Sequence, residues 1–172
     1  MAGATLTFDA SDADDALGRM LSAAGDLRPA LKNIAEHEVP ATKRRFIAQA
    51  DPEGKPWAAL NPLYATTKKG PGILRSPNRT LSREILYQLA DQSVTIGSNQ
   101  IYARIHNEGG TIVPKTASAL VFSMGGQTFK VKSVTIPRRQ FLGWSETDIR
   151  AVIDIVADHL MPDRGAPEPD PN

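Results

Sequence analysis

The chain has 172 residues, of which 41% are hydrophobic, and its 20 basic and 19 acidic residues give a net charge of +1. This length supports one domain with a real core, or one domain with extensions, and the small net charge argues against a general nucleic-acid binder. The absence of cysteine excludes disulfides, thiol catalysis and zinc–thiolate sites, and no apolar run approaches the length of about 18 residues that spans a bilayer.

The N-terminal part predicts a strand followed by a helix. Residues 4–8 alternate apolar and polar side chains, which is typical of a short strand. Ser11 and Asp14 form a capping pair for a helix predicted over residues 12–24. We interpret residues 1–26 as an extension, and their acidic start argues against a secretion signal.

A second helix is predicted to begin at Asp26, which can cap it, with Pro29 in its first turn. Pro40 removes one backbone hydrogen bond and crowds the preceding turn, so a break or bend is expected near Val39. The helical pattern resumes afterwards and ends at Asp51. The stretch is therefore read as one long bent helix or as two collinear helices.

Residues 51–72 form a loop rich in proline, glycine and lysine. It is longer than an ordinary connection, which indicates a functional or mobile segment. Trp57, interpreted as a core anchor, and Leu60 are expected to hold its first half. Lys68 and Lys69 lie in the half expected to be mobile.

The stretch that follows predicts a hairpin. Apolar side chains alternate over residues 85–89, and a turn at residues 91–92 leads into a strand at residues 94–96. Residues 97–99, which begin with Gly97, have the composition of a turn.

A one-turn helix is expected next, with Tyr102, Ile105 and His106 on one face. Gly109 and Gly110 should end it, Gly109 in the left-handed conformation. Tyr102 and Ile105 are expected to be buried. His106 is interpreted as a packed or hydrogen-bonded imidazole, in preference to a ligand or acid–base role.

Residues 119–124 and 127–132 flank the pair Gly125–Gly126, which is the clearest hairpin signal in the chain. Residues 134–136 are predicted to extend the same sheet, and Pro137 stops it.

The last helix is predicted to begin at Ser145, with Asp148 at the third position of a cap, and to run to Leu160. Residues 162–172 contain four prolines and lack core residues, so we expect a disordered tail. Residues 27–161 then form the domain proper. The expected class is α+β, a small antiparallel sheet with a long N-terminal helix and a C-terminal helix packed on it.

Four motifs, in the same order, resemble those of the phage virion morphogenesis family, the tail-completion proteins of Mu-type contractile-tailed phages and related prophages. They are DPEGKPWAAL at residues 51–60, Ile73–Leu74 followed by Leu81, IGS followed by YARIHNEGG within residues 96–110, and IPRRQFLGWS at residues 136–145. The resemblance covers roughly residues 27–160. The motif residues are Trp57, Leu60, Gly97, Tyr102, Ala103, His106, Gly109, Gly110, Pro137 and Gly143.

This resemblance implies a structural virion assembly protein, not an enzyme, which completes the tail or joins head to tail as a ring at the tail end or neck. The implied partners are tail tube or terminator proteins, head-connector proteins and further copies of the chain, with no cofactor and no membrane. The implied locations are the host bacterial cytoplasm during assembly and the tail or neck of the finished virion.

The segment after Pro137 carries the main candidate contact. Pro137 fixes the chain direction where the predicted strand ends, and the two arginines that follow, beside an apolar run, fit a protein–protein interface. The competing interpretation is that the aromatic residues seat the last helix while the arginines are solvated. The candidate interaction residues are Arg138, Arg139, Phe141, Trp144, Lys68 and Lys69.

Two functions of other classes stay open. The basic clusters suit a DNA-binding module, or a passing contact with DNA, but lack the interleaved aromatic residues of single-strand binders. A hydrolase could use His106 with Glu108 or Asp91. However, no metal-ligand spacing or nucleophile motif supports this reading.

Overall fold

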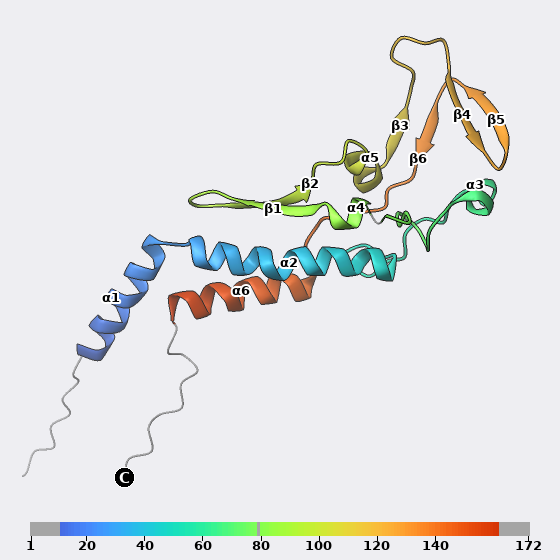
Figure 1. Ribbon diagram of the computed structural model, residues 1–172. Helices are drawn as coiled ribbons and strands as arrows, with labels where there is room; N and C mark the ends of the chain where they lie inside the picture. Colours follow the sequence, from blue (N-terminus) through green and yellow to red (C-terminus); the bar gives the residue numbers. More distant parts are fainter. Residues whose placement is uncertain (1–10, 79, 162–172) are drawn as a thin grey trace, which may run out of the picture.

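The computed structural model describes residues 11–78 and 80–161 (Figure 1). The strand predicted at residues 4–8 and the tail predicted at 162–172 lie outside this range. The observed class is α+β, as predicted. Among the described residues, no helix is long and apolar enough to cross a membrane.

Three long helices form one side of the molecule. Helix α1 (Ser11–Gly25) agrees with the predicted segment, α2 (Arg28–Ala48) is the longest, and α6 (Glu146–Leu160) lies alongside α2 (Figure 1). Helix α1 also contacts α6. The boundary proposed at residue 26 coincides with the turn between α1 and α2, but its status as a domain boundary stays a prediction.

Helix α2 is continuous through Pro40, so the alternative of two helices is wrong. Pro40 and Glu36 are both exposed, and the Glu36 carbonyl, which loses its helical donor, can therefore be hydrated. The opposite side of the same stretch buries Ala41 and Phe46. Helix α2 ends at Ala48, before the predicted end, because Gln49 adopts a left-handed conformation with φ of 56°.

The strands form three separate antiparallel pairs in place of the predicted single sheet. These are β1 (Ile85–Leu89) with β2 (Val94–Ser98), β3 (Gly110–Ile112) with β6 (Val134–Ile136), and β4 (Leu120–Met124) with β5 (Gln127–Val131). Both predicted hairpins are confirmed. However, β6 pairs with β3 and does not extend the β4–β5 hairpin. Gly97 and Ser98 belong to strand β2, where Gly97 faces Leu86, so the predicted turn at residues 97–99 begins too early.

Three short helices complete the described chain: α3 (Pro62–Thr67), α4 (Thr80–Arg83) and α5 (Ala103–Glu108). Helix α3 lies within the loop at 51–72 and is capped by Asn61, whose Oδ1 accepts hydrogen bonds from two backbone amides. Helix α5 is the predicted one-turn helix. It ends at Gly109, whose φ is positive as predicted (74°) although its ψ of −177° is extended.

The core lies between α2, β1 and the segment that leads into α6. Its buried members are Phe46, Trp57, Leu81, Ile85, Ala103 and Phe141. The Phe46 ring contacts the rings of both Trp57 and Phe141, with centroids 5.5 and 5.0 Å apart. Helix α5 contributes only Ala103 to this core. The predicted burial of Tyr102 is wrong, since its side chain is 38% exposed, and Ile105 is only half-buried.

Candidate assembly interface

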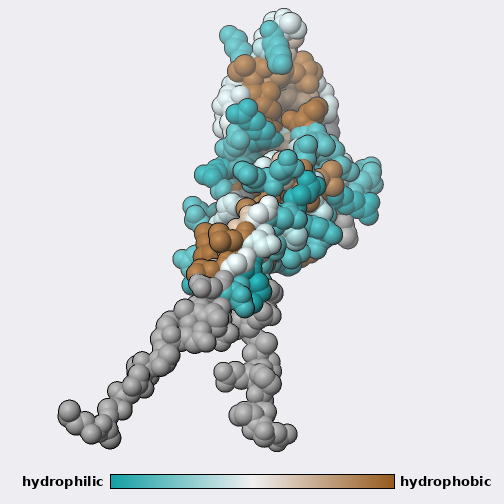
Figure 2. Space-filling model, turned by 90° about the vertical axis from the view of Figure 1, so that its left-hand side faces the viewer, coloured by the Kyte–Doolittle hydropathy of each residue, from teal (hydrophilic) through white to brown (hydrophobic). Residues whose placement is uncertain are grey.

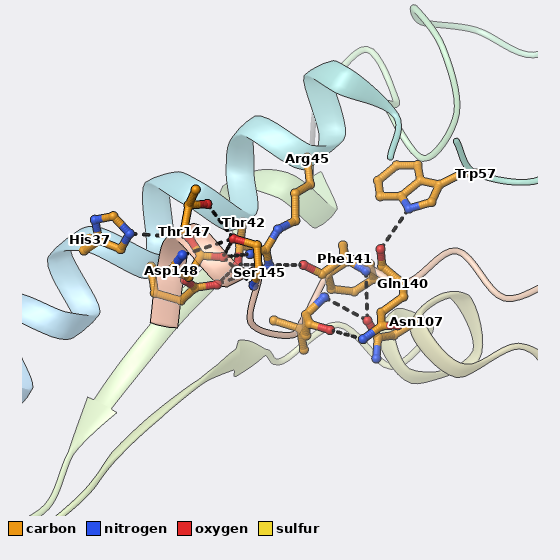
Figure 3. Close-up of polar contacts among 12 residues, drawn as sticks. His37, Thr42, Arg45, Trp57, Asn107, Gln140, Phe141, Ser145, Thr147 and Asp148 are labelled. Atoms are coloured by element: carbon orange, nitrogen blue, oxygen red, sulfur yellow. Dashed lines mark hydrogen bonds and ion pairs between the residues drawn. The ribbon is translucent and has the colours of Figure 1, made fainter. Parts of the chain in front are cut away.

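The segment from Pro137 to Trp144 joins β6 to α6 and carries most of the predicted interaction residues. Phe141 is buried in the core. Trp57 Nε1 donates to the Gln140 carbonyl at 2.8 Å, and Asn107 Oδ1 accepts from the backbone amides of Phe141 and Leu142 at 3.0 and 2.9 Å (Figure 3). Side chains from two distant family motifs therefore hold this segment in one conformation.

Arg139 is buried, which contradicts the expectation of two exposed arginines. Its guanidinium donates to the carbonyls of Ala58 and Ala59, both at 2.8 Å, and its backbone amide donates to the His106 carbonyl. Burial lowers the pKa of Arg139. The side chain thus ties the loop after Trp57 to the segment before α6.

Arg138 is the exposed member of the pair, and it donates to the Gln140 side-chain amide oxygen. The backbone of Arg138 lies against Gly109, where an added Cβ would come within 2.7 Å of the Arg138 nitrogen. This close approach and the positive φ explain why a glycine is required at position 109. The charged head of Arg138 remains on the surface beside the fixed segment.

A buried ionic cluster joins α2 to α6 behind this segment. Arg45 Nη2 lies 2.5 Å from Asp148 Oδ2, and Arg45 Nη1 lies 3.1 Å from Glu38 Oε1. Arg45 Nη1 also donates to the Phe141 carbonyl at 2.9 Å (Figure 3). Asp148 is at the same time part of the predicted cap, since its carboxylate accepts from the Ser145 amide and the Ser145 hydroxyl binds the Asp148 amide.

The same cluster contains a group with metal-ligand chemistry. Ligand atoms of His37, Glu38 and Asp148 lie within 4.8 Å of one another. The Arg45 guanidinium already pairs with both carboxylates, and a cation placed there would meet its positive charge at short range. We therefore assign these residues to a structural clamp between α2 and α6, not to a metal centre.

The pKa values of the two carboxylates in this cluster are shifted in opposite directions. Burial disfavours the charged form of Asp148, but its hydrogen bonds with Ser145 and the positive charge of Arg45 outweigh this and lower its pKa. Burial raises the pKa of Glu38, and Arg45 offsets only part of that effect. Glu38 Oε2 is also a buried oxygen without a hydrogen-bond partner in the described part of the chain.

Trp144 ends the fixed segment and is 50% exposed, in contrast to Phe141. It lines an open apolar depression together with Ile149, Val152 and Ile153 of α6; we call this the α6 groove. In the sequence, Ile149, Val152 and Ile153 recur at helical spacing, which is typical of an apolar helix face. The sequence did not show that α6 packs on α2 partly through Asp148, which leaves Ile149 and Ile153 exposed.

Lys68 and Lys69 lie in the loop expected to be mobile, but they are not equivalent. The Lys68 ammonium donates to the carbonyls of Lys69, Gly70 and Arg75, at 3.2, 3.1 and 2.6 Å. Burial and the charge of Arg75 lower its pKa. Lys68 therefore links residues 69 and 70 of the loop to Arg75 through its ammonium group. Lys69 is exposed.

The remaining motif residues support the fold around this segment. Tyr102 places its ring edge-on to His106, with centroids 6.1 Å apart. His106 Nδ1 is buried and has no partner among the described residues, so the imidazole is packed. Its pKa is lowered by burial and by Arg139. Leu60, Gly109 and Gly143 are half-buried, whereas Gly110 and Pro137 are exposed.

The geometry does not support the hydrolase alternative. Asp91 lies at the tip of the β1–β2 hairpin, where its carboxylate contacts Arg28 at 3.1 Å. Glu108 contacts Arg104 at 2.9 Å on the surface of α5. Both carboxylates thus pair with arginines and not with His106.

Comparison with known proteins agrees with the motifs. The sequence profile of the phage virion morphogenesis family matches residues 8–161. The chain is also similar to the putative capsid assembly protein G of Escherichia phage Mu, with 27% identity over 123 residues that cover 67% of this chain and 68% of the relative. No solved structure matches the chain significantly.

Proposed function

Because the chain belongs to the phage virion morphogenesis family, we propose that it completes the phage tail or joins head to tail as one subunit of a ring at the tail end or neck. Family membership gives it a structural role in phage assembly. The ring, its position and its neighbours are our proposal. Its partners are then further copies of the chain and the adjoining tail tube, terminator or head-connector proteins, and its final location is the virion.

One observation carries this proposal. Residues 137–144, which Trp57, Asn107 and Arg45 hold by hydrogen bonds and which we call the pinned segment, end in a half-exposed tryptophan beside the apolar α6 groove. A tryptophan fixed at the edge of an apolar depression is typical of the anchor residues of protein–protein interfaces. Enzymes instead need a concave site with convergent polar groups. Here the buried charged groups of Glu38, Arg45 and Asp148 bind one another and form the clamp described above.

Arg138 and Lys69 are the two basic residues of the predicted contact that remain exposed. We propose that Arg138 meets an acidic neighbour at the rim of the interface, because arginine binds carboxylates bidentately. Arg139 and Lys68 contribute indirectly, because their side chains bind backbone carbonyls and fix the loops that form this surface. DNA that passes through the ring would be a secondary contact of these surface charges.

Complementation tests the function. Particles that lack this protein are supplied with the wild-type chain or with a folded Trp144→Glu variant, and are scored by electron microscopy and plaque count. The wild-type chain should restore infectious particles, whereas the variant should leave tails unjoined to filled heads. Normal particles in the complete absence of the protein would contradict the proposal.

A further inference from the structure

The part of the chain between α5 and the pinned segment lacks a core of its own. The structure describes every residue from 110 to 136, and none of them is buried. This region includes the two strand pairs β3–β6 and β4–β5, which project from the body on the side away from α6 (Figure 1). We call residues 110–136 the arm. Two-stranded sheets that stand alone are only marginally stable in water.

The arm nevertheless has an apolar composition that is suited to burial. Phe122 and Phe129 face each other across β4 and β5, with stacked rings 5.7 Å apart, yet both remain partly exposed. Val121 on the other face is 66% exposed. Figure 2 shows a hydrophobic region over this upper part of the molecule. Each of the four strands is bonded to one neighbour only, so one edge of every strand is available for pairing.

The charges of the arm and of α6 are opposite. Residues 110–136 include Lys115, Lys130 and Lys132 and no acidic residue. On the surface of α6, Asp154 and Asp158 are exposed acidic residues, and Glu146 lies 3.7 Å from Arg150. A basic apolar arm and an acidic helix with an apolar groove are complementary in both charge and polarity.

We propose that the arm of one copy docks against the α6 groove of the next copy. This inference rests on the proposed ring and adds the contact that builds it. The arm and α6 lie on opposite sides of α2 (Figure 1). Hence the contact joins different patches on the two subunits. Such a heterologous contact closes into a ring when the rotation between subunits permits it.

A second copy is the occupant that the charges favour. Each copy carries both halves of the contact, and the docked arm would gain apolar cover beyond that of α3, which packs against β4 in the same chain. The groove residues Trp144 and Ile149 would be covered in the same step. DNA would attract the lysines but would leave Val121 and the two phenylalanines exposed.

The absence of native cysteine permits a direct cross-linking test. The full-length Val121→Cys, Ile149→Cys double variant is oxidised as concentrated purified protein and within complemented particles. Non-reducing electrophoresis should show a ladder of covalent oligomers, because every copy can link to two neighbours. The matched control is Val121→Cys, Leu86→Cys. Leu86 is as exposed as Ile149, 49% in each case, but lies on β1, on the other side of α2 (Figure 1), and this variant should give no covalent ladder.

The following results would overturn the inference. The first is the absence of a ladder in both preparations. The second is dimerisation of Val121→Cys alone at the level of the double variant, which would indicate contact between two arms. The third is linkage of the arm cysteine to another virion protein, or its protection by added duplex DNA. Loss of the ladder in particles that still contain the chain and are complete would reject this contact while leaving the proposed function intact.

Discussion

Arg45 and Asp148 are 103 residues apart in the sequence, yet Arg45 Nη2 and Asp148 Oδ2 lie 2.5 Å apart and both side chains are buried. Asp148 also caps α6 through Ser145, and Arg45 also binds the Phe141 carbonyl. The start of α6, its packing on α2 and the path of the pinned segment therefore depend on the same two charges.

Asp148→Ala should destabilise the protein by about 3–5 kcal/mol, because it leaves Arg45 buried with only Glu38 as a charged partner and removes half of the cap. Chemical denaturation monitored by circular dichroism measures this change. Glu146→Ala is the matched control on the same helix. Its carboxylate forms only an exposed contact of 3.7 Å with Arg150, so the change should stay within about 0.5 kcal/mol. Equal effects of the two substitutions would disprove the clamp.

The two neighbouring arginines should respond differently to truncation. Arg139→Ala removes two hydrogen bonds between a buried guanidinium and the carbonyls of Ala58 and Ala59, and should cost about 2–3 kcal/mol. Arg138→Ala should change stability by less than about 0.5 kcal/mol but should reduce particle completion. Thermal melts and complementation separate these effects. A stable Arg139→Ala variant that fails in assembly would contradict the structural role and indicate that Arg139 is an interface residue.

The two tryptophans provide a second contrast. Trp57→Ala should cost about 3–5 kcal/mol, since its ring is buried against Phe46 and its Nε1 binds the Gln140 carbonyl. Trp144→Ala removes a half-exposed ring, so we expect a small loss of stability together with loss of tail completion. Measurement of unfolding and of particle yield on the same two variants tests this. Normal yield with Trp144→Ala would remove the α6 groove from the mechanism.

His106 should make stability depend on pH. Its folded pKa lies below the ordinary value of 6.5 because of burial and Arg139, so the unfolded chain binds more protons than the folded one. This contribution is fully present above about pH 6.5 and is lost as the pH falls below that value. The stability of the wild type should therefore fall more steeply than that of His106→Gln between pH 7.5 and about pH 5. Parallel slopes would show that His106 does not contribute to the acid sensitivity.

Local signals predicted much of the fold. Ser145 and Asp148 predicted the cap of α6, and Gly125–Gly126 predicted the β4–β5 hairpin. Both features depend on residues only a few positions apart in the sequence. Trp57 was correctly interpreted as a core residue. The α+β class followed from these elements and the helical periodicities.

The features that sequence reasoning missed depend on contacts between distant segments. Strand β3 pairs with β6 across the β4–β5 hairpin, and no local pattern distinguishes that pairing from one extended sheet. Gly97 joins β2 because β1 continues to pair as far as Ile85, opposite Ser98. Arg139 looks like a surface residue until the loop at Ala58 and Ala59 is placed beside it. The α6 groove likewise appears only when the packing of α6 on α2 is known.

We propose above all that copies of this chain form a ring at the tail end or neck. Cryo-electron microscopy of particles complemented with the wild-type chain tests it most directly. We predict ring-shaped density at that position into which the chain fits, with the arm of each subunit reaching the α6 groove of its neighbour. Completed particles without such density, or with the chain spread along the tail or over the capsid, would contradict the account.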